Sequence, residues 1–153
     1  MKFDRLYIAA LRETAALSTC AKHKVGAILV RDGRIISTGY NGAPANMPHC
    51  CDMPAFKSST AFSDDNIRSF HREWSAQNEV HAEVNCIGYA LRMHTDITGA
   101  ELWLSLPPCI PCAGLIIAAG IQKIVYISDA TTTGTSAGLL HSCGIEFKQY
   151  IGD

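Results

Sequence analysis

The chain has 153 residues, of which 48% are hydrophobic and 18% are charged, and its formal net charge at pH 7 is −1. This length and composition fit one globular domain with a buried core and leave no room for a second independent domain. Because no run of Lys or Arg stands out, the sequence lacks the basic surface expected of a protein that binds a nucleic acid polymer.

The N-terminus and the cysteine content indicate the compartment in which the chain works. Residues 1–5 mix acid and base without an apolar core, unlike a signal peptide, and the longest apolar stretch, residues 115–121, is too short to span a bilayer. We therefore expect a cytoplasmic protein without membrane contact. In that reducing compartment, an odd count of seven cysteines favours metal ligands and buried thiols over disulfides.

In chain order, the first expected elements are a helix and a β-hairpin. Apolar residues recur at helical spacing over residues 3–17, which predicts an amphipathic helix. The apolar runs 25–30 and 34–38 predict two antiparallel strands, because Asp32-Gly33 between them is a strong hairpin signal. The next stretch, residues 40–65, is rich in Asn, Gly, Pro and Ser, which predicts a long functional loop.

The second half of the chain alternates expected helices and strands. The remaining elements are, in order, a helix over about residues 80–93, a strand over 101–105, a helix from Cys109 to Gly120, a strand over 123–127, a short helix over 135–143 and a strand over 145–148. In the first of these helices, Val84, Ile87, Leu91 and the small residues between them fit one face, which we expect to be buried. The whole order predicts an α/β fold, with three α-β-α layers around a central mixed five-stranded sheet.

Two short motifs stand at the starts of consecutive expected helices. One contains His81, and the other, Pro-Cys-Ile-Pro-Cys, contains Cys109 and Cys112. A helix N-terminus favours thiolate over thiol, so both cysteines are well placed to become zinc ligands. Together with His81 they supply three protein ligands and leave the fourth tetrahedral position to water, which is typical of a catalytic zinc.

Glu83 follows His81 by two residues, so the two side chains do not share a helix face and Glu83 is not a second ligand. We interpret it as a proton shuttle between zinc-bound water, a ring nitrogen and a departing amine, while hydroxide attacks the amidine carbon. This combination of histidine, glutamate and Pro-Cys-x-x-Cys is a signature already described for zinc deaminases. A lone Cys-x-x-Cys indicates only a zinc knuckle or buried thiols, but the two motifs together favour the catalytic interpretation.

Further sequence blocks accompany the zinc motifs. They are Lys24-Val25-Gly26-Ala27, Ile35-Ile36-Ser37-Thr38-Gly39-Tyr40-Asn41-Gly42, Cys50-Cys51-Asp52, Glu73-Trp74-Ser75 and Asn78-Glu79-Val80-His81-Ala82-Glu83-Val84-Asn85. In this series the chain resembles the deoxycytidylate (dCMP) deaminases, especially the phage type, over nearly its whole length. The resemblance implies a cytidine deaminase-like fold and conversion of dCMP to dUMP and ammonia, with attack at C4, to supply dUMP for thymidylate synthesis.

The resemblance also implies a set of substrate contacts. In the superfamily the asparagine of the Tyr-Asn-Gly turn reaches the substrate sugar, and the matching residue here is Asn41. Val25 and the backbone amide of Ala82 would line the base pocket, with Ser105 and Leu106 close by.

A second zinc is implied by the resemblance to the phage type. The matching ligands are Cys20, Cys50, His71 and Glu79. Four ligands without an open position would anchor the long loop, as a closed structural site does. From the residues alone, one or two buried cysteines and a surface histidine are the alternative.

Regulation and assembly are implied in the same way. Relatives are commonly hexamers that dCTP activates and dTTP inhibits, with Mg²⁺ accompanying the nucleotide. Tyr89 and Arg92 lie on the expected helix after His81, where relatives place subunit-contact and effector-linked residues. For an exposed helical arginine, simple solvation is the alternative.

One departure from the family pattern concerns phosphate recognition. Relatives often carry a lysine or an aromatic residue after residues 127–129, whereas residues 130–135 here are Ala-Thr-Thr-Thr-Gly-Thr. Hydroxyl groups and amides at a helix start can bind phosphate without a lysine. A polar loop without a ligand is an equal alternative.

Three other functions compete with dCMP deamination. A transfer RNA adenosine deaminase shares the zinc motifs, but the slightly acidic charge argues against binding a polyanion. Deaminases of free cytidine more often have cysteine in place of His81. The chain could also be a non-catalytic nucleotide-binding protein that contains a structural zinc. However, a structural zinc does not require a free carboxylate such as that of Glu83 beside it.

Overall fold

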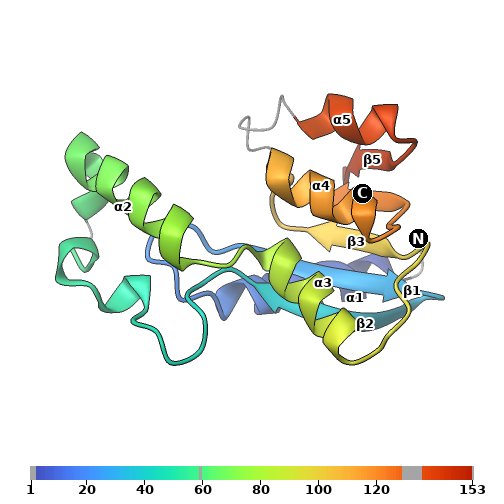
Figure 1. The fold of residues 1–153 in the computed structure, drawn as a ribbon, viewed down its shortest axis with the longest axis horizontal. Coiled ribbons are helices and arrows are strands. Elements are labelled where there is room, and N and C mark those ends of the chain that lie inside the picture. The colour runs from blue at the N-terminus through green and yellow to red at the C-terminus, as the bar shows by residue number, and fades with distance from the viewer. Residues whose placement is uncertain (1–2, 59, 129–135, 153) are drawn as a thin grey trace.

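Five strands form one mixed sheet at the centre of the computed structural model, which describes residues 3–58, 60–128 and 136–152 (Figure 1). The strands are β1 (Gly26–Arg31), β2 (Arg34–Tyr40), β3 (Glu101–Leu104), β4 (Lys123–Tyr126) and β5 (Glu146–Gln149). Their order in the sheet is β2-β1-β3-β4-β5. β1 is antiparallel to β2 and β3, whereas β3, β4 and β5 are mutually parallel. The predicted mixed five-stranded sheet is therefore confirmed.

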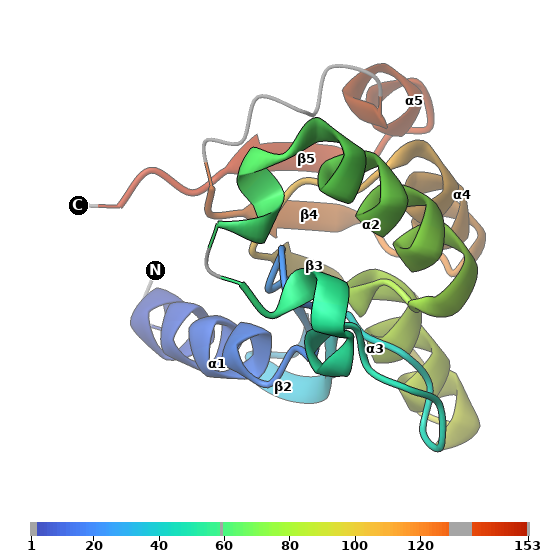
Figure 2. The ribbon, with the colours of Figure 1, turned by 90° about the vertical axis from the view of Figure 1, so that its left-hand side faces the viewer.

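Helices cover both faces of this sheet. They are α1 (Asp4–Ala16), α2 (Asp65–Asn78), α3 (Ala82–Arg92), α4 (Ile110–Ala118) and α5 (Ser136–Ser142). Figure 2 shows α1 on one face and α3, α4 and α5 on the other, which confirms the three-layer α-β-α prediction. α2 lies beyond one end of the sheet, together with three single-turn 3₁₀ helices that interrupt the long loop (Figure 1).

α2 is the element that the sequence did not predict. It carries a short apolar stripe of Ile67, Phe70 and Trp74 at helical spacing, but only His71 is buried. Ile67 and Trp74 pack partly buried against the small cluster around Phe56 rather than against the main core. A weaker signal was present at its start. The carboxylate of Asp64 accepts a hydrogen bond of 2.7 Å from the backbone N–H of Asn66, as an N-cap does.

The core divides into two layers because the side chains of each strand alternate between the two faces of the sheet. Ala27 and Leu29 of β1 belong to the layer under α3 and α4. Ile28 and Val30 point the other way, into a smaller layer with Tyr7 of α1 and others. A strand covered on both faces needs a continuous apolar sequence, which explains the unbroken apolar run in β1.

α3 buries small residues rather than the large apolar ones expected to face the core. Ile87 is fully buried, but Val84 and Leu91 are 38% and 52% exposed. The buried face includes Ala82, Cys86 and Ala90. Small side chains let α3 approach the sheet closely, so the spacing of the large residues was a poor guide to the buried face.

Two further sequence expectations can be compared with the fold directly, and a third cannot. All seven cysteines are free of disulfides, as predicted. Within the described ranges, no helix is both long enough and apolar enough to cross a membrane. Residues 130–135, considered above for phosphate binding, lie outside the part of the chain that the structure describes.

The close approach of α3 to the sheet predicts that Gly39 cannot be replaced. A Cβ atom at this position would lie 2.4 Å from the backbone nitrogen of Cys86 and 2.6 Å from the carbonyl oxygen of Ala82. We expect Gly39→Ala to lower the free energy of unfolding by about 2–3 kcal/mol, since backbone atoms must shift to make room. Thermal unfolding followed by circular dichroism measures this effect.

Gly114 provides the matched control, because a Cβ atom there would have no neighbour within 4 Å. It lies inside α4, where exchanging glycine for alanine stabilises a helix by about 1 kcal/mol. Gly114→Ala should therefore unfold at or above the wild-type temperature. Equal unfolding temperatures for Gly39→Ala and the wild type would contradict the packing argument.

Candidate metal centre and active site

The first functional cluster joins the starts of α3 and α4. His81 is the N-cap of α3, Cys109 is the N-cap of α4, and Cys112 lies in the first turn of α4. The Nδ1 atom of His81 lies 3.5 Å from the Sγ atom of Cys109 and 3.4 Å from that of Cys112. Ligands of a tetrahedral zinc at ordinary bond lengths are separated by about 3.5 Å. The three side chains therefore fit a zinc ion with one position left over.

Burial adds an electrostatic reason for a cation in this cluster. Desolvation raises the pKa of the buried Cys112 thiol, and the neighbouring Glu83 and Cys109 raise it further. A bound metal ion would supply the positive charge that the thiolate form needs.

Glu83 lies in the first turn of α3 and is only 4% exposed. It lines a cavity of about 280 Å³ together with His81 and Cys109. Burial raises the pKa of the Glu83 carboxyl, and its own backbone N–H, His81 and Cys112 offset this shift only in part. A carboxyl group in this setting is suited to proton transfer beside a metal.

Most of the predicted substrate residues line this same cavity. Val25, Asn41, Ala82 and Leu106 all contribute to its wall. Ser105 does not, because its Oγ atom accepts a hydrogen bond of 2.9 Å from the backbone N–H at the start of β1. The structure thus gives Ser105 a supporting place behind the wall.

Three further residues line the cavity that the sequence analysis did not single out: His23, Ser75 and Pro107. Ser75 belongs to the block Glu73-Trp74-Ser75, to which no role was given, and Pro107 adjoins the Pro-Cys-Ile-Pro-Cys motif, so both positions could have been inferred from these motifs. His23 lies in the irregular segment between α1 and β1, and no signal in the sequence distinguishes it there.

The second cluster consists of Cys20, Cys50, His71 and Glu79, whose ligand atoms all lie within 4.8 Å of one another. The Sγ atom of Cys20 is 3.4 Å from the Nε2 atom of His71. The two cysteines and His71 are buried, and desolvation raises the pKa of the Cys50 thiol to about 12. The structure therefore brings together four ligands of three types from three separate segments.

One carboxylate oxygen of Glu79 has an unusual environment. The hydroxyl of Ser75 donates a hydrogen bond of 2.5 Å to Oε2, whereas the buried Oε1 has no hydrogen-bond partner among the described residues. An unpaired buried oxygen beside two buried thiols is costly unless a cation compensates for it. This cluster is thus also chemically suited to a metal, and it offers no open position.

The two clusters are neighbours along the chain as well as in space. Glu79 and His81 are separated only by Val80, and members of both clusters line the one cavity. Val80 forms an isolated antiparallel bridge with Gly42, through backbone hydrogen bonds of 3.1 and 2.8 Å. The bridge holds residues 79–81 against the turn that carries Asn41.

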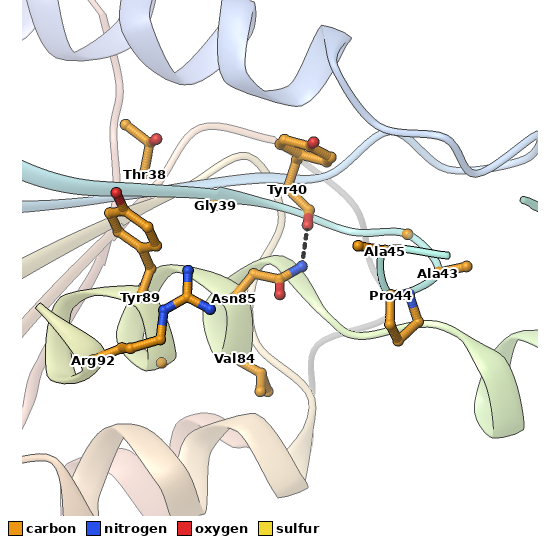
Figure 3. A pocket seen from close by; sticks show the side chains of 12 residues that line it. Thr38, Gly39, Tyr40, Ala43, Pro44, Ala45, Val84, Asn85, Tyr89 and Arg92 are labelled. Atoms are coloured by element: carbon orange, nitrogen blue, oxygen red, sulfur yellow. Dashed lines mark hydrogen bonds between the residues drawn. The ribbon is translucent and has the colours of Figure 1, made fainter. Parts of the chain in front are cut away.

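Tyr89 and Arg92 lie outside the cavity, in a separate groove of about 470 Å³ (Figure 3). The groove runs between α3 and the segment that follows β2, and both side chains project from α3 towards β2. The guanidinium of Arg92 lies 5.3 Å from the centre of the Tyr89 ring. The side chain of Asn85 donates a hydrogen bond of 2.7 Å to the carbonyl of Tyr40, which lies between Tyr89 and the residues 43–45 that also line the groove.

The fold has three α-β-α layers, and at two helix starts it holds a His-Cys-Cys cluster together with a buried glutamate. This combination defines a zinc-dependent hydrolytic deaminase. The chain belongs to the cytidine and deoxycytidylate deaminase family, whose model, described as the "Cytidine and deoxycytidylate deaminase zinc-binding region", matches residues 1–128.

Individual relatives agree with this placement. The chain is 39% identical to the deoxycytidylate deaminase of Enterobacteria phage T4, with 84% of this chain and 80% of the relative covered. It is 36% identical to that of Mycobacterium phage D29, with 84% and 96% covered. The crystal structure of the dCMP deaminase from cyanophage S-TIM5, in complex with dCMP and dUMP, has a TM-score of 0.77 at 25% identity and covers 97% of both chains.

Proposed function

We propose that this chain catalyses the hydrolytic deamination of dCMP to dUMP and ammonia. The observation that carries the proposal is the buried Glu83 carboxyl in one cavity wall with the zinc-type ligands His81 and Cys109. The choice of nucleotide is supported by the relatives: the phage T4 and D29 proteins are named for this activity, and the S-TIM5 enzyme binds dCMP and dUMP.

The reaction replaces the amino group at C4 of cytosine by oxygen, and the residues of the site must transfer two protons while this happens. A zinc ion held by His81, Cys109 and Cys112 would supply the Lewis acidity that makes water a nucleophile near neutral pH. Glu83 takes a proton from the attacking water and delivers it to N3 of cytosine, as the water oxygen bonds to C4. It then carries the second proton from that oxygen to the amino group, so that the C4–N bond breaks and ammonia leaves.

The cavity wall would recognise the rest of the nucleotide. Val25 and the backbone amide of Ala82 are proposed to contact the base, and Leu106 closes the wall beside them. Asn41 is proposed to contact the sugar. Ser105 supports the start of β1 from behind, so its contribution would be indirect.

The function is tested by ammonia release and loss of cytosine absorbance with dCMP, dCTP, CMP and deoxycytidine. We expect dCMP to be the preferred substrate. Glu83→Gln keeps the size of the side chain but removes its ability to shuttle protons, so kcat should fall by roughly 10³-fold with zinc content unchanged.

Two results would replace this proposal with one of the alternatives. If the wild type were as inactive as Glu83→Gln on every nucleotide, the non-catalytic nucleotide-binding protein would be favoured. If the wild type instead deaminated adenosine in transfer RNA, the chain would be a transfer RNA deaminase despite its acidic charge.

We also propose that Cys20, Cys50, His71 and Glu79 hold a second, structural zinc. The support is the unpaired Oε1 atom of Glu79 and the burial of both thiols. Cys20 lies in the segment after α1 and Cys50 in the long loop. His71 lies in the middle of α2, and Glu79 directly follows the last residue of that helix. A metal there would join the loop and α2 to the body of the protein, adding to the small apolar cluster around Phe56 and to the hydrogen bond of 3.1 Å from the backbone N–H of Cys51 to the carbonyl of Thr19.

Metal analysis of the purified protein should therefore find two zinc ions per chain. Cys109→Ser should lose one zinc and the activity, whereas Cys50→Ser should lose the other. Cys143→Ser is the control, because this exposed cysteine belongs to neither cluster. One zinc per chain in fully active wild-type protein would rule out the second site.

The groove at Tyr89 and Arg92 is the proposed effector site, where dCTP activates and dTTP inhibits. Arg92 offers a guanidinium for phosphate oxygens, Tyr89 offers a ring for stacking, and Mg²⁺ would accompany the triphosphate. The groove and the cavity are lined by adjacent residues of the same two segments, Asn41 beside Gly42 and Glu83 beside Val84. An effector bound in the groove would thus change the positions of cavity residues through the backbone segments that line both hollows.

Arg92→Ala should raise the dCTP concentration that gives half-maximal activation by about tenfold, because a charge-assisted hydrogen bond to phosphate is lost. Activation curves at fixed dCMP measure this value. Arg12→Ala is the matched control, since Arg12 is an exposed arginine on α1, away from the groove. Equal activation of both variants would place the effector elsewhere.

A hexamer in the cytoplasm remains our prediction for the assembled enzyme. On α3, Val84 and Leu91 are exposed, and Met93, the C-cap of this helix, is 58% exposed. Exposed apolar side chains that lie near one another are typical of a surface that a neighbouring subunit covers. Their exposure in the single chain supports an oligomer.

A further inference from the structure

The hydroxyl of Ser18 joins the active-site cavity to the second ligand cluster. Ser18 directly follows the end of α1 and is only 6% exposed. Its Oγ atom lies 2.6 Å from Oδ1 of Asn41 and 2.9 Å from the carbonyl oxygen of the same residue, so its single proton is shared between the two. The same Oγ atom accepts a hydrogen bond of 3.2 Å from the backbone N–H of Cys20.

These neighbours determine which way the Asn41 amide points. The backbone N–H of Val25 donates to Oδ1 at 2.8 Å, and Nδ2 donates to the carbonyl oxygen of His23 at 2.8 Å. A backbone N–H can only donate and a carbonyl can only accept, so a flipped amide would lose both bonds. With Ser18 added, both lone pairs of Oδ1 are occupied.

One hydrogen-bonding group of the Asn41 side chain then remains for a ligand in the cavity. It is the second N–H of Nδ2, because no other described residue accepts it. Asn41 therefore meets the substrate as a donor, and the substrate atom opposite it must be an acceptor. A sugar hydroxyl oxygen meets this requirement with its lone pairs.

We propose that Ser18 is a positioning residue, which orients the Asn41 amide as a donor towards the substrate and ties it to the backbone at the ligand Cys20. The inference deepens the proposed function and rests on it. Through Ser18, ordering of the second cluster would also order Asn41, because the Ser18 hydroxyl contacts both the Asn41 side chain and the backbone N–H of the ligand Cys20.

Steady-state kinetics of Ser18→Ala with dCMP and its 3′-deoxy analogue test the proposal. Loss of the hydroxyl should raise KM for dCMP by about tenfold with little change in kcat, since one hydrogen bond that orients Asn41 is removed. The preference for dCMP over the 3′-deoxy analogue should shrink by a similar factor. Ser18→Thr, which keeps the hydroxyl, should restore both values.

Ser37→Ala is the matched control. Ser37 is also buried and its hydroxyl donates to a backbone carbonyl, that of Cys86, at 2.7 Å, but it does not line the cavity. Ser37→Ala and Ser18→Ala should both lower the unfolding temperature, but Ser37→Ala should leave the KM for dCMP unchanged. A purely structural role for Ser18 would make the two variants alike.

Two results would overturn the inference and leave the proposed function intact: a Ser18→Ala enzyme with wild-type KM and wild-type preference for the 3′-hydroxyl, or a KM shift equally large in Ser37→Ala. A wild type that does not deaminate dCMP would instead refute the proposed function. Even then, a crystal structure of Ser18→Ala tests the positioning role. If the Asn41 amide keeps its orientation and remains well ordered in that variant, Ser18 does not position it.

Discussion

The backbone bridge between Gly42 and Val80 is the interaction on which the site depends. Its two hydrogen bonds join the turn after β2 to the residues just before α3. On one side of it stands Asn41, and on the other stand Glu79 and His81. The cavity between them therefore has walls from two distant parts of the sequence, held at a separation set by backbone geometry. The bridge also explains why α3 begins at Ala82 rather than at Val80.

Burial of metal-ligating and acidic groups is the second constraint. Thiols of both clusters and the carboxylates of Glu79 and Glu83 are removed from water, wholly or in part. A buried carboxylate is destabilising unless it is paired, and a buried thiol becomes anionic only beside a cation. The arrangement is consistent with a protein whose active site and outer loop are completed by metal ions, and whose irregular segments have little apolar core of their own.

The cavity and the outer groove use opposite sides of the same backbone. Asn41 faces the cavity, while the next residues, 42–45, line the groove. The first turn of α3 is divided in the same way between Glu83 and Val84. A ligand in either hollow can influence the other only by moving these shared segments. The hydrogen bond from Asn85 to Tyr40 and the close packing at Gly39 limit such movement.

The sequence by itself determined the sheet, the order of most elements and the His81, Cys109 and Cys112 cluster, because these depend on local signals. Strand alternation, the Asp32-Gly33 turn and ligands at helix starts are properties of short segments. Only the tertiary structure decided the features that depend on distant contacts. Cys20, Cys50 and His71 were named from the family resemblance, but only folding brings their distant segments together, and the apolar stripe of α2 packs on the small cluster around Phe56 beside them. The hydrogen bond from the start of β1 to the hydroxyl of Ser105 is likewise a contact between distant segments.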